Sequence, residues 1–202
     1  MKAEKLSRDL SQSVDRAVIG VFATCDPRID QESRSRASNI IKMTADFLAG
    51  GTQLPNGQVV PVVYSDILID SEIQADQVAQ QFKQRGVNIL VGVPDTWAFP
   101  QLTVISLLSH FPKDIPINFT CGNSGPRPGV VFTHAVSGAI SQYGGLIHIN
   151  VGNWPDSGRY PEMSQKTKVS LLDWIYAAVT FQELKGRRVV IFGHDSMGME
   201  TA

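Results

Sequence analysis

Polar and aromatic side chains follow several apolar stretches of this sequence, directly where each stretch ends. Carboxylate, amide and guanidinium groups bind hydroxyl groups, and a tryptophan packs against the apolar face of a sugar ring. The combination predicts a carbohydrate site. Its candidate residues, all of which follow predicted strands, are Asp26, Arg28, Asp66, Asp95, Trp97, Asn123, Asn153, Trp154, His194 and Asp195. For two of them a structural role is open as well, because Asp95 could N-cap the following helix and Trp97 could cover the core.

The elements that must position these residues alternate along the chain. Continuous apolar runs are typical of buried parallel strands, and a period near 3.6 is typical of helices. The pattern predicts strands at 17–24, 59–64, 87–93, 115–120, 146–151 and 187–192, with helices at 31–48, 71–85, 99–111, 130–143 and 162–184. Such alternation gives right-handed crossovers. The predicted fold is a doubly wound, flavodoxin- or Rossmann-like three-layer α/β domain, with a mostly parallel sheet of about six strands.

Several finer expectations follow from single residues. Pro61 cannot donate a hydrogen bond, so strand 59–64 is expected at an edge of the sheet. Ser71 is expected to N-cap the second helix, with Ile73, Val78 and Phe82 facing inward. The polar segment 1–16 is expected to be a weak amphipathic helix or an arm, and 17–202 a single domain. Because the chain ends in a glycine-rich turn after the last predicted strand, we expect a longer parent protein.

Composition excludes several classes of function. The chain has 202 residues and a net charge of -1, so it has no electrostatic footprint for nucleic acid or an anionic membrane. Two cysteines are too few for a disulfide framework. The N-terminus is polar, and no apolar run approaches the roughly 20 residues of a membrane span. We therefore expect a cytoplasmic protein with neither nucleic-acid nor membrane partners.

Known catalytic and cofactor motifs do not fit. The turn at 25–28 lacks the glycines of a dinucleotide fingerprint, and 122–125 lacks the lysine of a phosphate-binding loop. His194 and Asp195 follow the last predicted strand but lack the further ligands that a metal needs. No catalytic residue and no metal ligand is therefore predicted in this chain. The roles of His194, Asp195 and Trp154 stay open.

Four short motifs keep one order relative to the predicted strands. They are Ser65-Asp66, Val93-Pro94-Asp95-Thr96-Trp97, Arg127-Pro128-Gly129 and Ser196-Met197-Gly198. In this order the chain resembles the N-terminal domain of an L-fucose isomerase-like enzyme, from the family that also contains D-arabinose isomerases. The resemblance extends from about residue 17 to the end. The loops 51–57 and 156–162, and Asn153-Trp154, depart from the family's pattern.

The resemblance implies a function for a longer protein. Family members interconvert an aldose and a ketose with a divalent metal, typically manganese, held with the catalytic carboxylates in later domains. The N-terminal domain completes the sugar pocket of a neighbouring subunit in a homo-oligomer. Arg28 and Trp97 match the substrate-binding residues, and Asp26 precedes Arg28 as in the family's pattern. Asp95 and Asn123, from their positions after predicted strands, are expected to form the pocket wall together with Asp26. This chain alone would then be inactive and bind no cofactor. The alternative is a stand-alone sugar-binding or regulatory α/β domain without catalysis.

Overall fold

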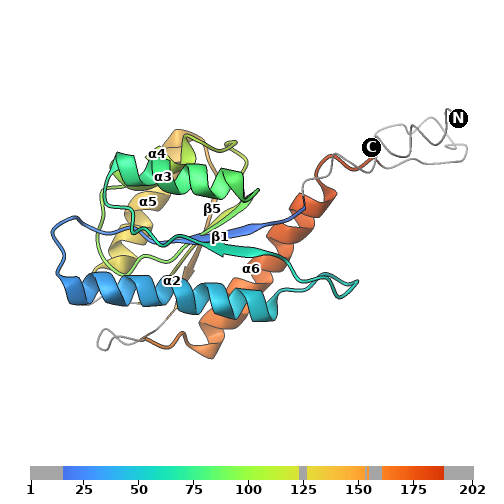
Figure 1. The fold of residues 1–202 in the computed structure, drawn as a ribbon, viewed down its shortest axis with the longest axis horizontal. Coiled ribbons are helices and arrows are strands. Elements are labelled where there is room, and N and C mark those ends of the chain that lie inside the picture. The colour runs from blue at the N-terminus through green and yellow to red at the C-terminus, as the bar shows by residue number, and fades with distance from the viewer. Residues whose placement is uncertain (1–15, 123–126, 153, 155–160, 189–202) are drawn as a thin grey trace, which may run out of the picture.

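The computed structural model describes residues 16–122, 127–152, 154 and 161–188. Its centre is one parallel sheet in the order β2-β1-β3-β4-β5 (Figure 1). The strands are β1 (Ile19–Phe22), β2 (Val62–Tyr64), β3 (Ile89–Gly92), β4 (Ile117–Cys121) and β5 (Ile147–Val151). The predicted doubly wound α/β fold is thus confirmed, with five strands in the part of the chain that the structure describes.

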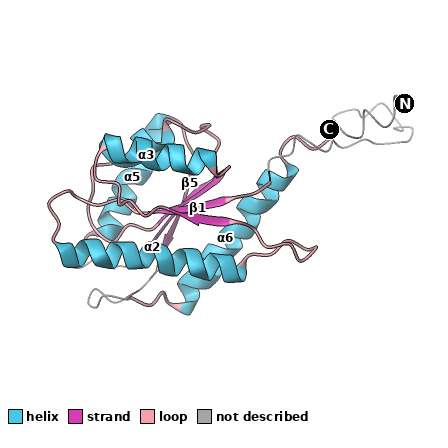
Figure 2. Ribbon diagram, viewed as in Figure 1, coloured by secondary structure: helices cyan, strands magenta, loops and turns pink. Residues whose placement is uncertain are grey.

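Helices cover both faces of the sheet (Figure 2). They are α2 (Gln31–Gly51), α3 (Glu72–Gln84), the π-helical turn η1 (Gln101–Ile105) with α4 (Ser106–Leu108), α5 (Gly129–Tyr143) and α6 (Gln165–Leu184). The chain runs outward from β1 to β2 and then back across the sheet. Right-handed crossovers therefore place α2 on one face and α3, α4 and α5 on the other. The final helix, α6, shares the face of α2 (Figure 1).

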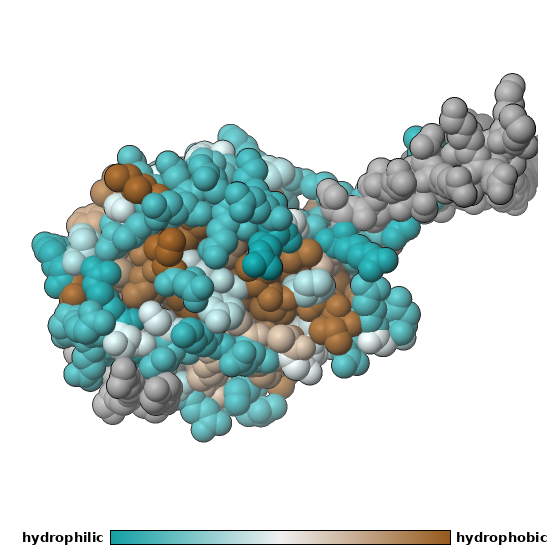
Figure 3. Space-filling model, in the orientation of Figure 1, coloured by the Kyte–Doolittle hydropathy of each residue, from teal (hydrophilic) through white to brown (hydrophobic). Residues whose placement is uncertain are grey.

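Each face of the sheet has its own hydrophobic core. Ile40 and Ile41 of α2 pack with Leu171 and Ile175 of α6 in one cluster. The other cluster joins α3, α4 and α5, around Phe82, Leu107 and Phe132 among others. In Figure 3 apolar side chains form a band between the helix layers, while the outer helix surfaces are mostly hydrophilic. The sheet is accordingly buried on both faces, as its continuous apolar strands predict.

The edge position of strand 59–64 is confirmed, since β2 ends the sheet and pairs only with β1 among the described strands. Ser71 occupies the N-cap position of α3, as expected, although its side chain makes no capping hydrogen bond. The expected inward orientation of Ile73 was wrong. Ile73 is 72% exposed, because it lies roughly opposite the buried Ala75 on the helix.

The third crossover is shorter than expected. Instead of one helix over 99–111, the π-helical turn η1 leads into a single turn of α4.

The predicted arm, residues 1–16, lies almost wholly outside the described residues, and so does most of the predicted strand 187–192. The same holds for Asn123, His194 and Asp195.

Candidate functional site

A hollow of about 320 Å³ lies at the carboxyl ends of β1 and β3. Its lining comes from the loop after β1, the start of α2, the segment after β3 and the start of α5; the residues are Asp26, Arg28, Ile29, Ser33, Thr96, Trp97, Arg127 and Pro128. The order of strands reverses between β1 and β3. In open α/β sheets, ligands bind beyond the carboxyl ends of the strands at such a switch point. The hollow therefore occupies the expected binding position of this fold.

Asp26 holds the guanidinium group of Arg28 in a fork. Arg28 donates from Nε to Asp26 Oδ1 over 2.8 Å and from Nη2 to Oδ2 over 2.6 Å. The Arg28 backbone N–H also donates to Oδ1, over 2.9 Å. The carboxylate is largely buried, whereas 78% of the arginine side chain is exposed. The pair thus fixes a planar cation whose remaining N–H groups face outward, as binding of hydroxyl groups requires.

The same contacts set the protonation of Asp26. Hydrogen bonds from the Arg28 side chain and then from its backbone lower the pKa of the Asp26 carboxyl to about 2. The contact also raises the pKa of Arg28. Because both groups are charged at neutral pH, the fork is maintained there.

The loop that carries this pair is anchored to α2 at both ends. Asp30 N-caps the helix, because its side chain accepts a hydrogen bond of 2.7 Å from the Ser33 N–H. Arg34 donates to the Pro27 carbonyl over 2.8 Å and to Asp70 Oδ2 over 3.1 Å. The latter contact ties the loop to the segment after β2. The position of Arg28 is thus set by the fold.

Trp97 is half-buried and anchored by a chain of edge-to-face aromatic contacts. Its ring meets Phe132 of α5 with centroids 6.1 Å apart and planes at 80°. Phe132 in turn meets Phe119 of β4, and Phe119 meets Phe22 of β1. Such pairs stabilise by about 0.5–1.5 kcal/mol each beyond the burial of area. Trp97 therefore has both of the roles considered for it: it contacts the core, and it lines the candidate sugar site.

Asp95 is buried in the segment that leads from β3 to Trp97. Its Oδ2 accepts a hydrogen bond of 2.9 Å from Arg36 Nε, and the two side chains are 0% and 1% exposed. The prediction that Asp95 caps the next helix was wrong, since Pro100 holds the N-cap position of η1. Asp95 is also absent from the lining of the hollow. This ion pair instead joins α2 to the segment that carries Trp97.

Arg127 closes the hollow on the side of α5. Its Nη1 donates to Ser33 Oγ in the first turn of α2. Ser33 lies one turn before Arg36, so α2 contacts both Arg127, which lines the hollow, and the buried Asp95. The motif Arg127-Pro128-Gly129 contributed to the resemblance, but the roles of Ser33 and Arg36 were missed. Arg36 falls on the apolar stripe of α2, between Ser33 and Ala37, and that position was the signal of a buried partner.

Trp154 does not reach the hollow. It is 2% exposed and belongs to the core cluster on the α2 side of the sheet, close to Gly122. Its Nε1 has no hydrogen-bond partner among the described residues. A core role therefore accounts for this strand-end tryptophan, whereas Trp97 lines the candidate site.

A larger groove, of about 500 Å³, lies between β5 and α6, and none of the predicted site residues lines it. Among the described residues, no group of three or more His, Cys, Asp or Glu side chains could hold a metal ion. No helix in the described ranges is both long and apolar enough to cross a membrane.

Comparison with known proteins identifies the family. The sequence model described as "L-fucose isomerase, first N-terminal domain" matches residues 16–186. The chain belongs to the L-fucose isomerase family. The match confirms the resemblance seen in the sequence, and it spans every described helix and strand of this N-terminal domain. No curated protein matches the chain.

Proposed function

We propose that this L-fucose isomerase N-terminal domain completes the sugar pocket of a neighbouring subunit in a metal-dependent aldose–ketose isomerase. Arg28 and Trp97 are the substrate-binding residues, and Asp26 is part of the pocket wall. The single observation that carries the proposal is their meeting in one hollow at the switch point of the sheet. Arg28 and Trp97 are 69 residues apart in the sequence, and the fold brings both to the lining of this hollow.

The two side chains suit a sugar in different ways. A half-buried indole, held by Phe132, presents apolar surface against which the C–H groups of a sugar ring pack. A guanidinium group fixed by Asp26 donates to sugar hydroxyls without losing much conformational freedom on binding. An open hollow also suits a pocket that a second subunit closes. Asn123 stays a predicted wall residue outside the described ranges, and Asp95, paired with Arg36, joins α2 to the segment that carries Trp97.

Hydrogen transfer between the two sugar carbons belongs, in this proposal, to catalytic domains of the longer isomerase. The described residues do not form a metal-binding group, so we assign no metal ligand to them. The divalent metal, manganese by the family resemblance, would be held with the catalytic carboxylates elsewhere. Assembly as a homo-oligomer and a cytoplasmic location stay predictions.

Kinetics of the assembled isomerase test the proposal. We expect Trp97→Ala and Arg28→Ala each to lower kcat/KM for the preferred aldose by about tenfold to a hundredfold, equivalent to about 1.4–2.7 kcal/mol. Trp97→Phe keeps an aromatic ring and should retain more activity than Trp97→Ala. Arg85→Ala, an exposed arginine at the end of α3, is the matched control and should leave kcat/KM unchanged.

Unchanged kcat/KM for every tested aldose in both alanine variants would overturn the proposal.

Calorimetry on the isolated chain tests the alternative of a stand-alone sugar-binding domain. Binding of L-fucose or D-arabinose by this chain alone would favour that alternative, whereas the proposal predicts no binding without the catalytic domains of the longer isomerase.

A further inference from the structure

The outer edge of β5 is an open strand edge. The Gly152 N–H donates to the Cys121 carbonyl, so the peptide groups of alternate residues of β5 face β4. The remaining peptide groups, those of Ile147, Ile149 and Val151, point away from the sheet. No strand within the described residues pairs with this edge.

The two edges of the sheet differ in how they are protected. β2 has three residues and follows directly on Pro61, and both features limit pairing with a further strand. β5 has five residues, Ile-His-Ile-Asn-Val, with neither a proline nor a charge. Its neighbour Leu146 is 85% exposed. Natural proteins usually block such an edge or cover it, and β5 has no blocking feature of its own.

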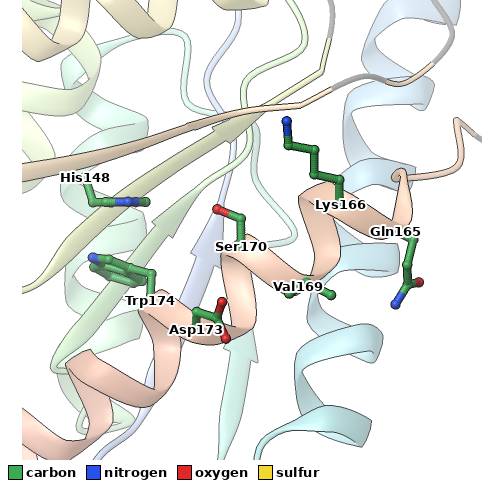
Figure 4. A pocket seen from close by; sticks show the side chains of 7 residues that line it. All are labelled: His148, Gln165, Lys166, Val169, Ser170, Asp173 and Trp174. Carbon is green, nitrogen blue, oxygen red and sulfur yellow. The ribbon is translucent and has the colours of Figure 1, made fainter.

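α6 forms a groove beside this edge (Figure 4). The imidazole of His148 lies flat over the indole of Trp174, with centroids 5.9 Å apart and planes at 22°. His148 Nδ1 lies 2.7 Å from Asn118 Nδ2, and Asn118 Oδ1 accepts from Thr120. The amide therefore donates to Nδ1, and burial lowers the pKa of His148. The groove wall is thus a fixed, neutral surface suited to close packing.

The carboxyl end of α6 is anchored away from this edge. Gln182 Nε2 donates to the Asn88 carbonyl before β3, and Glu183 accepts from the Ala17 N–H before β1. The end of α6 therefore lies near the amino ends of the central strands. A right-handed crossover through a helix on this face also leads toward β4 and not toward the open edge.

We propose that the open edge of β5 binds a second copy of this chain, with the two β5 strands antiparallel about a two-fold axis at Ile149. A two-fold axis perpendicular to the sheet places the β5 edges of the two copies antiparallel to each other. The interface is then isologous, because both copies contribute the same surface. Ile147 then pairs with Val151 of the second copy, and the two sheets become one. The surface is separate from the hollow at β1 and β3.

Charges on α6 complement one another in this arrangement. Trp174 lies level with His148, and the Thr167 carbonyl accepts from Asn150, so the middle of this stretch of α6 lies level with Ile149. Lys166 and Asp173 line the groove on either side of that level. They are seven residues, about 10 Å, apart on one helix face, too far to pair within one copy. The two-fold axis sets each Lys166 opposite Asp173 of the other copy.

Charge reversal tests the interface without disturbing the fold, because both side chains are exposed. In sedimentation equilibrium of the 202-residue chain we expect a dimer. Lys166→Glu and Asp173→Lys should each weaken it by about tenfold, since each change places like charges together at two symmetric positions. The double variant Lys166→Glu/Asp173→Lys should restore the dimer affinity to within about threefold of the unmodified chain. In it the ion pair between the copies forms again with the two charges exchanged.

Lys83→Glu is the control: it makes the same charge change on α3, remote from β5, and should leave the dimer unchanged. A monomer at every concentration would overturn the proposal. So would a dimer unaffected by the single reversals, or a double variant as weak as the single ones. The assay involves no sugar, so its result is independent of the proposed pocket.

Discussion

The buried ion pair between Arg36 and Asp95 gives the largest stability prediction of this fold. The two side chains are 1% and 0% exposed and 2.9 Å apart. Replacing Asp95 by Asn keeps the shape of the side chain but leaves the Arg36 charge without its carboxylate. Removing one partner of a buried pair costs about 3–5 kcal/mol, a large part of the 5–15 kcal/mol by which domains are stable. We expect Asp95→Asn to lower the free energy of unfolding by that amount.

Equilibrium urea unfolding, followed by far-UV circular dichroism, measures this change. With a urea slope near 2 kcal/mol per molar, the midpoint should fall by about 2 M. The double variant Arg36→Met/Asp95→Leu removes both charges and should be more stable than Asp95→Asn. Asp114→Asn breaks an exposed pair with Lys185 and should change stability by no more than about 1 kcal/mol. A loss below about 1 kcal/mol for Asp95→Asn would refute the reasoning.

Three further predictions concern packing, protonation and thiol reactivity. Gly92→Ala places a methyl group 2.6 Å from the fully buried ring of Phe119, so thermal unfolding should show a loss of about 1–3 kcal/mol. Arg28→Ala removes the hydrogen bonds that depress the pKa of Asp26, so carboxyl NMR should show that pKa rising from about 2 toward 3.8. Burial raises the pKa of Cys25 to about 11, so a thiol reagent should leave it unmodified at neutral pH until the chain unfolds.

A control variant and contradicting outcomes accompany these predictions. Gly138→Ala meets no atom within 4 Å on α5 and should stabilise the helix by about 0.5–1 kcal/mol. A folded chain whose Cys25 reacts as fast as a free thiol would contradict the buried position. For Asp26, the stabilisation by the fork should be complete above about pH 4 and lost as the pH falls through about 2, because its folded pKa lies below the unfolded value. An unchanged pKa in Arg28→Ala would contradict that cause.

The architecture could be predicted from the sequence because its signals are local. Apolar runs marked the parallel strands, and Pro61 marked the edge strand. The meeting of Arg28 and Trp97 was predictable in outline, since the carboxyl ends of neighbouring parallel strands share one edge of the sheet. The family motifs supplied the rest of that prediction.

What could not be predicted depends on contacts between distant segments. The partner of Asp95 is 59 residues away in α2, and a carboxylate before a helix resembles a cap equally well. Trp97 and Trp154 both follow strands, yet one lines the hollow and the other lies in the core. Only the three-dimensional packing of α2, α5 and α6 distinguishes these roles.

Hybrid oligomers test most directly whether this domain serves its neighbour's pocket. Subunits carrying Trp97→Ala are mixed with subunits inactivated in their catalytic domain, dissociated together and reassembled. If Trp97 acts in a neighbouring subunit, an intact catalytic domain meets an intact Trp97 in the hybrids, and aldose–ketose isomerisation should recover well above that of either parent. Recovery no greater than the sum of the two parents would contradict the proposal.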